Sequence, residues 1–182
     1  MKLIANIGLF KIGWLACVYG AASGLAVEGC LLALLIVTFT VKRAANVQAE
    51  LLTVALITLI GLAWETLVAS QHLMIYVGQT DSQLSGPVLA PFWLVVMWAL
   101  FATTINQSMG WLKERLIVAA GLGAIFGPLA FVAGEKLGAV VFLNEPAAMT
   151  VLASGWAILM PAVCVVARIV ETRYSAQLSV EQ

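Results

Sequence analysis

The sequence predicts an all-α membrane protein, a polytopic bundle of six transmembrane helices with both termini in the cytoplasm. Three observations support this prediction: the overall composition, six long apolar runs, and the placement of lysine and arginine between those runs. Of the 182 residues, 63% are hydrophobic and only 10% are charged, and the mean hydropathy is +1.04. A soluble domain is about 45–50% apolar and about 25% charged, so this chain has too little polar surface to cover a soluble core.

The six apolar runs are each close to the roughly 20 helical residues that cross the hydrocarbon core of a bilayer. Helices are expected because backbone groups in lipid must be paired within their own segment, and no period-2 barrel pattern is present. We find no repeat and no linker, so residues 1–182 are expected to form one integral membrane domain. The expected spans are residues 3–20, 25–40, 51–70, 91–110, 116–133 and 147–170.

The basic residues predict the orientation of these spans, because lysine and arginine concentrate in cytoplasmic loops. With the N-terminus in the cytoplasm, seven of the nine basic residues fall on the inner side. Lys136 falls on the outer side, and Lys11 lies within the first span. The seven inner residues are Lys2, Lys42, Arg43, Lys113, Arg115, Arg168 and Arg173.

The first two spans are expected to form a helical hairpin, joined by the Ala-Ala-Ser-Gly turn at residues 21–24. Lys11 interrupts the first apolar run, which argues against a cleavable signal peptide and favours a retained span. The three cysteines of the chain lie within apolar runs and show no CxxC spacing, so buried free thiols are expected. They are Cys17, Cys30 and Cys164.

The fourth span carries polar side chains near its cytoplasmic end. At 100° per residue, Thr104 and Ser108 share one helix face, while Thr103, Asn106 and Gln107 share a neighbouring face. One interpretation is that these groups form hydrogen bonds to other helices and hold the bundle together. The other is a polar pocket for a lipid head group or a small ligand. Before this span, the outer loop of residues 71–90 contains the single histidine, His72, expected to be solvated.

Residues that favour close helix packing or a helix bend occur at the end of the first span and in and after the fifth and sixth spans. Glycine pairs spaced by four residues let helix backbones approach, either inside one chain or between two copies. A proline inside a helix removes a backbone donor and predicts a bend. Residues 137–143 are too short to cross, so they either continue the fifth helix or form an interfacial or re-entrant piece. The pairs are Gly20 with Gly24, Gly123 with Gly127 and Gly134 with Gly138, and the prolines are Pro128 and Pro161.

Apart from Arg168 at the cytoplasmic end of the sixth span, three charged residues lie inside the predicted spans: Lys11, Glu28 and Glu65. A charge in mid-membrane costs at least about 2.5–3.5 kcal/mol, so such residues usually face the interior and have partners. We expect the Lys11 ammonium to be held by one or both carboxylates in the outer half of the bundle. This group is either an ion pair that orients three helices or a proton site in which two carboxylates share a charge. A lysine that reaches water alone is the third interpretation.

Several function classes lack their signatures. One histidine cannot supply a di-iron centre or a bis-histidine haem, and there is no P-loop, no GxSxG elbow and no run of paired aspartates. We therefore expect no cofactor and no metal. A net charge of zero gives no indication of a nucleic-acid partner.

Two strings carry a family resemblance: FATTINQSMGWLKER at residues 101–115 and GAIFGPLAFVAGEKLGA at residues 123–139. They resemble a bacterial inner-membrane family designated only as a domain of unknown function, number twenty-eight seventy-eight, and the resemblance covers nearly the whole chain. In the first string and the ten residues before it, the matching positions are Pro91, Trp93, Leu94, Trp98, Phe101, Ala102, Thr104, Asn106, Ser108, Trp111 and Leu112. In the second string they are Gly127, Pro128, Leu129, Ala130, Ala133, Gly134, Glu135, Leu137, Gly138 and Ala139.

Two positions depart from the family pattern. Gln107 stands where the family often has histidine, which weakens any metal or proton-shuttle role, and Phe131 stands where it has tyrosine. The family has no established activity. Its members often resemble proteins whose genes lie beside fatty-acid-modifying genes. The resemblance therefore implies a connection with membrane lipid.

Three hypotheses follow from the sequence. The first is an accessory or scaffold protein of the inner membrane that works with a lipid-modifying enzyme, with membrane lipid, that enzyme or a second copy of the chain as its partner. The second is a small transporter or flippase-like carrier that uses the Lys11, Glu28 and Glu65 group, although no inverted repeat is found. The third is a cofactor-independent membrane enzyme with Glu65 or Glu135 as acid or base, the least supported of the three.

Overall fold

The computed structural model describes residues 3–79 and 88–180, the last four of these by their backbone alone. The described residues form a helical bundle with one short two-stranded sheet. In chain order the elements are α1 (Leu3–Ala22), α2 (Ala26–Lys42), α3 (Val47–Ser70), β1 (Met74–Tyr76), α4 (Phe92–Ile105), the 3₁₀ helix η2 (Gly110–Glu114), α5 (Leu116–Lys136), β2 (Val140–Phe142) and α6 (Glu145–Val180).

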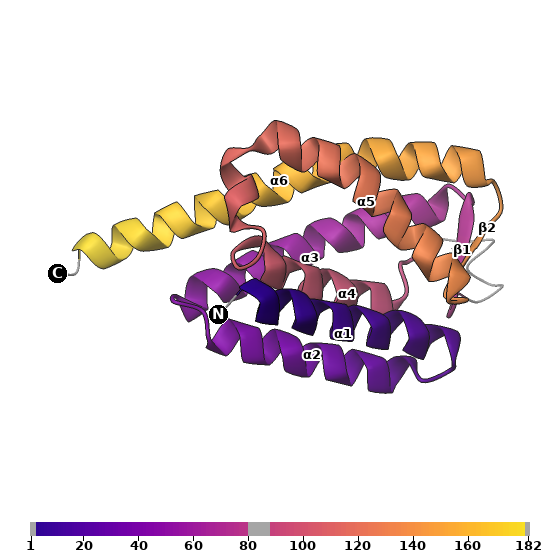
Figure 1. Ribbon diagram of the computed structural model, residues 1–182, viewed down its shortest axis with the longest axis horizontal. Helices are drawn as coiled ribbons and strands as arrows, with labels where there is room; N and C mark the ends of the chain where they lie inside the picture. Colours follow the sequence, from indigo (N-terminus) through magenta and orange to yellow (C-terminus); the bar gives the residue numbers. More distant parts are fainter. Residues whose placement is uncertain (1–2, 80–87, 181–182) are drawn as a thin grey trace.

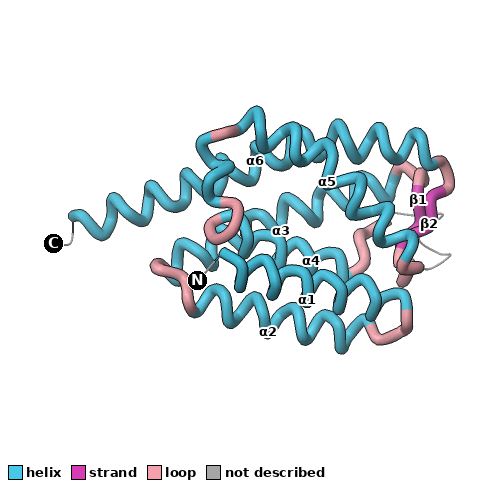
Figure 2. Tube along the Cα trace, viewed as in Figure 1, coloured by secondary structure: helices cyan, strands magenta, loops and turns pink. Residues whose placement is uncertain are grey.

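The helices lie in three layers, with α1 and α2 in one, α3 and α4 in the next, and α5 and α6 in the third (Figure 1). Helix α4 is central and contacts α1, α2, α3 and α6. Successive helices run in opposite directions, so their connections gather at the two ends of the bundle (Figure 2). We call the end with the α2–α3 and α4–α5 connections the η2 end, and the end with β1 and β2 the sheet end.

All six predicted spans form helices, with ends within a few residues of the predicted ones except in α4 and α6. Among the described residues, α1, α3, α5 and α6 are long and apolar enough to cross a membrane. Helices α2 and α4 are shorter, with 17 and 14 residues. The molecule therefore has the helical, apolar character of a membrane protein, with four helices of full spanning length.

Helix α4 ends at Ile105, so the prediction that its polar residues continue on the same helix to Ser108 is wrong. The backbone N–H groups of Gln107 and Met109 both donate to the Thr104 carbonyl, at 3.1 and 2.8 Å. These bonds close a turn in place of the helical ladder. Asn106 and Ser108 consequently lie in the connection to η2, where their side chains can reach different neighbours.

Residues 137–143 do not continue helix α5, and the alternative of an interfacial or re-entrant piece stays a prediction. Helix α5 ends before Gly138, whose φ of +84° favours glycine, and the chain then enters β2. Strands β1 and β2 are antiparallel, with Met74 opposite Phe142 and Tyr76 opposite Val140. Both strands consist of residues that favour extended backbone, Met-Ile-Tyr and Val-Val-Phe, and that composition was the signal for the sheet.

Small residues let the helices of one chain approach closely. A Cβ atom on Gly123 or Gly127 would collide with Trp156, and one on Gly123 also with Met160, both on α6. Gly24 and Gly138 instead have positive φ and lie in turns, so their pairs with Gly20 and Gly134 do not form one helix face. All three cysteines are free and buried. Helices α5 and α6 continue through Pro128 and Pro161, and the bends expected there stay predictions.

Candidate functional site

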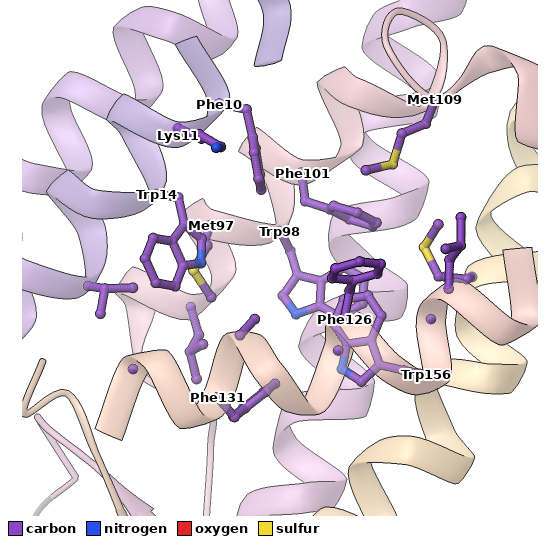
Figure 3. A pocket seen from close by; sticks show the side chains of 18 of the residues that line it. Phe10, Lys11, Trp14, Met97, Trp98, Phe101, Met109, Phe126, Phe131 and Trp156 are labelled. Carbon is purple, nitrogen blue, oxygen red and sulfur yellow. The ribbon is translucent and has the colours of Figure 1, made fainter. Parts of the chain in front are cut away.

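A cavity of about 550 Å³ lies between α1, α4 and α5, and we call it the lateral pocket (Figure 3). Its walls are mainly aromatic and aliphatic side chains. Residues of η2 and α6 complete it, and Glu65 of α3 reaches it from behind α4. Charged or hydroxyl-bearing side chains enter the lining at three places: Lys11, Glu65 and Ser108.

The mouth of the lateral pocket opens along the sides of the helices. Helix α1 packs on α2 and α4, and α5 packs on α6, which leaves α1 and α5 as separate walls. Three large apolar lining residues are substantially exposed: Ile7 on α1 at 39%, Trp111 in η2 at 51% and Phe126 on α5 at 62%. The mouth of the pocket therefore lies on the side of the helical bundle.

Glu65 is the most deeply buried charged residue of the described chain, with 1% of its surface exposed. The Tyr76 hydroxyl donates a hydrogen bond to Glu65 Oε2 at 2.9 Å, and the Trp98 indole N–H donates to Oε1 at 3.0 Å. Each carboxyl oxygen therefore has one donor, as burial requires. Because α3, β1 and α4 each contribute one residue, Glu65 joins three elements at the sheet end.

Tyr76 is held as a hydrogen-bond donor. Burial raises the pKa of its phenol well above the usual range, and the adjacent Glu65 carboxyl group raises it further. The phenol therefore stays protonated and keeps its bond to Glu65. Tyr76 also contacts two aromatic rings, Trp93 and Phe131, with centroid distances of 6.3 Å each.

Stacked aromatic rings form the base of the lateral pocket. Trp98 and Trp156 lie nearly parallel, 5.1 Å apart at 11°, and Phe101 meets both edge-on at 5.5 and 5.6 Å. The Trp98 ring lies against Gly61, where any Cβ atom would collide with it. The Trp156 side chain lines the pocket. Its indole nitrogen is buried and has no hydrogen-bond partner among the described residues.

The predicted ion pair between Lys11 and the two carboxylates does not form among the described residues. Glu65 is satisfied by two neutral donors, Tyr76 and Trp98. Glu28 lies exposed in the first turn of α2. Lys11 is exposed on the α1 wall of the lateral pocket. The structure thus brings Lys11 and Glu65 to one cavity without joining them.

A second polar cluster, which we call the Glu50 network, lies at the η2 end. Asn106 Nδ2 donates to Glu50 Oε2 at 2.8 Å, and Lys113 Nζ donates to Asn106 Oδ1 at 3.1 Å. Lys113 also forms a 2.6 Å salt bridge with the exposed Glu171 of α6. Glu50 itself is buried, and its Oε1 has no partner among the described residues.

Sequence reasoning missed Glu50 because the third span was taken to begin at residue 51. Helix α3 begins at Val47, where the Asn46 side chain accepts a hydrogen bond from the Ala49 N–H at 2.9 Å. Asparagine is a preferred N-cap residue. The signal was therefore present, because an asparagine precedes the apolar run and Glu50 follows it inside the first turn.

The other predicted polar residues have separate roles. The Thr103 and Thr104 hydroxyls donate to carbonyls of their own helix at 2.7 and 2.6 Å. Among the polar residues predicted for the fourth span, the described hydrogen bonds between side chains of different helices involve Asn106 alone. Gln107 is half-buried and Ser108 is buried at the pocket. At the sheet end, Glu135 accepts a hydrogen bond from the Phe142 N–H at 3.5 Å.

The chemistry of the lateral pocket is that of a binding site. No group of three or more His, Cys, Asp or Glu side chains that could hold a metal ion occurs in the described part of the chain. The Glu65 carboxyl group is already bonded to Tyr76 and Trp98, and apart from Lys11 and Ser108 the remaining lining side chains are mainly aromatic and aliphatic. The geometry fits a long apolar ligand that enters from the side of the bundle.

No curated protein and no solved structure matches the chain significantly. A family profile matches residues 3–162, a range that includes the whole lateral pocket and the Glu50–Asn106–Lys113 part of the Glu50 network. The chain belongs to the family described as "Protein of unknown function (DUF2878)".

Proposed function

We propose that this protein binds the acyl chain of a membrane lipid in the lateral pocket and acts as an accessory protein of lipid modification in the bacterial inner membrane. The observation that supports this proposal is a mainly apolar cavity of about 550 Å³ whose exposed apolar lining residues lie on the side of the bundle. Ligand pockets commonly measure about 300–1,000 Å³. One acyl chain is therefore a ligand of suitable size and polarity.

The aromatic lining explains why a chain would enter the pocket from lipid. Moving a hydrocarbon chain out of a bilayer gives little hydrophobic gain, because lipid tails are as apolar as the pocket. Binding must instead come from close dispersion contacts. The stacked rings of Trp98, Phe101 and Trp156 offer large rigid surfaces for such contacts.

The arrangement favours holding a ligand over passing an ion through the bundle. The polar groups of the Glu50 network lie at the η2 end, and those around Glu65 lie at the sheet end. The side chains of the lateral pocket between Glu65 and Ser108 are mostly apolar. A carrier for a polar solute would need polar groups along that path.

Our proposal includes six membrane crossings with both termini in the cytoplasm. Helix α2, with 17 residues, is about 26 Å long at 1.5 Å per residue, so it reaches most of the way across the core. Helix α4, with 14 residues, is followed by a turn and by η2 before α5 begins. The described basic residues Lys42, Arg43, Lys113 and Arg115 lie at the η2 end, which supports assigning this end to the cytoplasm.

The test is lipid retention by the purified protein, measured by native mass spectrometry from a mild detergent. Ala130 lines the lateral pocket, and Ala130→Phe adds a ring to that space. Leu129→Phe adds a ring to the same helix at an exposed position outside the pocket. We expect wild type and L129F to retain lipid and A130F to lose most of it. Equal retention by A130F, or no retained lipid in wild type, overturns the proposal.

The accessory role has its own test. A deletion strain should differ from wild type in the modification of its membrane acyl chains, measured by fatty-acid profiling, and A130F should not restore the wild-type profile. An unchanged profile in the deletion strain counts against the accessory role, whether or not lipid binds. Co-purification can then show whether the partner is a lipid-modifying enzyme or a second copy of the chain.

A further inference from the structure

We propose that the ligand of the lateral pocket is an anionic single-chain lipid, a fatty-acid carboxylate, whose head group pairs with Lys11. This inference rests on the proposed acyl-chain binding and adds the charge and depth of the head group. The relevant observations are that Lys11 lines the pocket without a counter-charge, that the Glu65 carboxyl group is already bonded, and that Lys11 lies near the middle of α1.

Lys11 is a charged group without a counter-charge. It lines the pocket on α1, and no carboxylate forms a salt bridge with it among the described residues. Figure 3 shows its side chain on the α1 wall together with Phe10 and Trp14. Charged residues inside membrane spans normally have partners, so a ligand that supplies a negative charge completes this site.

The polar groups of the pocket favour an acceptor in the ligand. Glu65 is the one carboxyl group of the lining, and both oxygens of Glu65 are already bonded, to Tyr76 and to Trp98. Lys11 offers up to three donors and a positive charge, which suits a carboxylate and does not suit a cationic head group.

The depth of Lys11 distinguishes a free fatty acid from a phospholipid. Lys11 lies about 12 Å along α1 from its first residue and about 16 Å from its last, near the middle of the helix. A phospholipid would have to bring a bulky polar head group and the start of a second chain from the interface to this depth. A fatty acid brings one carboxylate, whose charge Lys11 neutralises.

The experiment uses the tryptophans of the pocket as reporters. Five of the six tryptophans in the chain line the lateral pocket: Trp14, Trp93, Trp98, Trp111 and Trp156. Dibromostearic acid carries bromine atoms that quench nearby indole fluorescence, and its methyl ester has the same brominated chain without the charge. Both are added to the full-length protein in detergent micelles at alkaline pH, where the acid is ionised.

Lys11→Met removes the charge and keeps a long side chain, and Lys11→Arg keeps the charge. Lys136→Met is the matched control, since Lys136 is exposed at the end of α5 and does not line the pocket. In wild type and K136M we expect the acid to quench at about tenfold lower mole fraction than the ester. In K11M the acid should require the same mole fraction as the ester, and in K11R the preference for the acid should return.

The outcomes separate the two proposals. Equal quenching by acid and ester in wild type, or an unchanged acid preference in K11M, overturns the pairing with Lys11 while acyl-chain binding stands. A loss of preference in K136M as well as in K11M overturns the pairing too, because it indicates general charge attraction to the micelle-bound protein. No saturable quenching by either compound overturns acyl-chain binding and this inference with it.

Discussion

Trp98 donates its indole N–H to the Glu65 carboxyl group at 3.0 Å. Its ring lies against Gly61, one helical turn before Glu65 on the same helix, α3. One side chain of α4 is thus positioned at two neighbouring points of α3, by a hydrogen bond and by a close ring contact. The same ring stacks on Trp156 of α6, so the position of Trp98 sets the shape of the pocket base.

Removing the Glu65 carboxyl group should destabilise the bundle. In Glu65→Ala the buried Tyr76 hydroxyl and Trp98 N–H lose their acceptor, at a cost of about 1–3 kcal/mol for each donor. Glu65→Gln should cost less, because its carboxamide can accept from Trp98 and donate to the Tyr76 oxygen. The measurement is the thermal unfolding midpoint in detergent, with Glu28→Ala as the exposed control. Equal midpoints for E65A and E28A would contradict the buried network.

A methyl group on Gly61 should displace Trp98. Gly61→Ala places a Cβ atom inside the space of the indole ring, and overpacking of this kind costs about 1–3 kcal/mol. Gly121→Ala on α5 is the control, because a Cβ atom there meets nothing within 4 Å. We expect G61A to lower the unfolding midpoint and change the tryptophan emission spectrum, and G121A to leave both near wild type. A wild-type spectrum for G61A would show that the ring contact is absent.

The stability of the protein should fall at alkaline pH because of Tyr76. The folded state raises the pKa of this phenol above its ordinary value of about 10, so the folded chain holds the proton more tightly than the unfolded chain. This contribution is complete below about pH 10 and is lost as the pH rises further. Unfolding midpoints measured against pH should decline less steeply in Tyr76→Phe than in wild type. Parallel curves would contradict the raised pKa.

A negative charge at position 106 should disrupt the Glu50 network. Asn106→Asp replaces the amide donor at 2.8 Å from Glu50 Oε2 with a second carboxylate, and like charges this close repel strongly. Gln107→Glu adds the same charge one residue away, where no side-chain hydrogen bond is lost. We expect N106D to unfold at a clearly lower temperature than Q107E. If the two variants have the same midpoint, the bond to Glu50 does not stabilise the bundle.

The helices could be predicted from the sequence because crossing a bilayer requires long apolar runs, and all six runs form helices. The pairing of α1 with α2 could be predicted as well, since only a short turn separates them. The early end of α4 could not, because residues 106–110 remain compatible with a helix by composition. The turn is closed by two hydrogen bonds to the Thr104 carbonyl, and hydropathy contains no information about them.

The partners of the charged residues were harder to predict than the helices. These helices are apolar on nearly every face, so periodicity does not show which face of α1 or α3 turns inward. The depth of Glu65 suggested Lys11 as its partner, and the structure places Tyr76 and Trp98 there instead. Tyr76 is positioned beside Glu65 by the β1–β2 sheet. The two strands lie far apart in the sequence, since Tyr76 pairs with Val140, 64 residues later.

The two walls of the lateral pocket belong to different helical hairpins: α1 is the first half of the N-terminal hairpin, and α5 is the first half of the C-terminal one. Until the C-terminal hairpin packs against the rest of the chain, Trp98 lacks its stacking partner Trp156 and the pocket lacks its α5 wall. Under the proposed function, a lipid could therefore be held only after both hairpins have come together, and its retention would report that the C-terminal hairpin has docked.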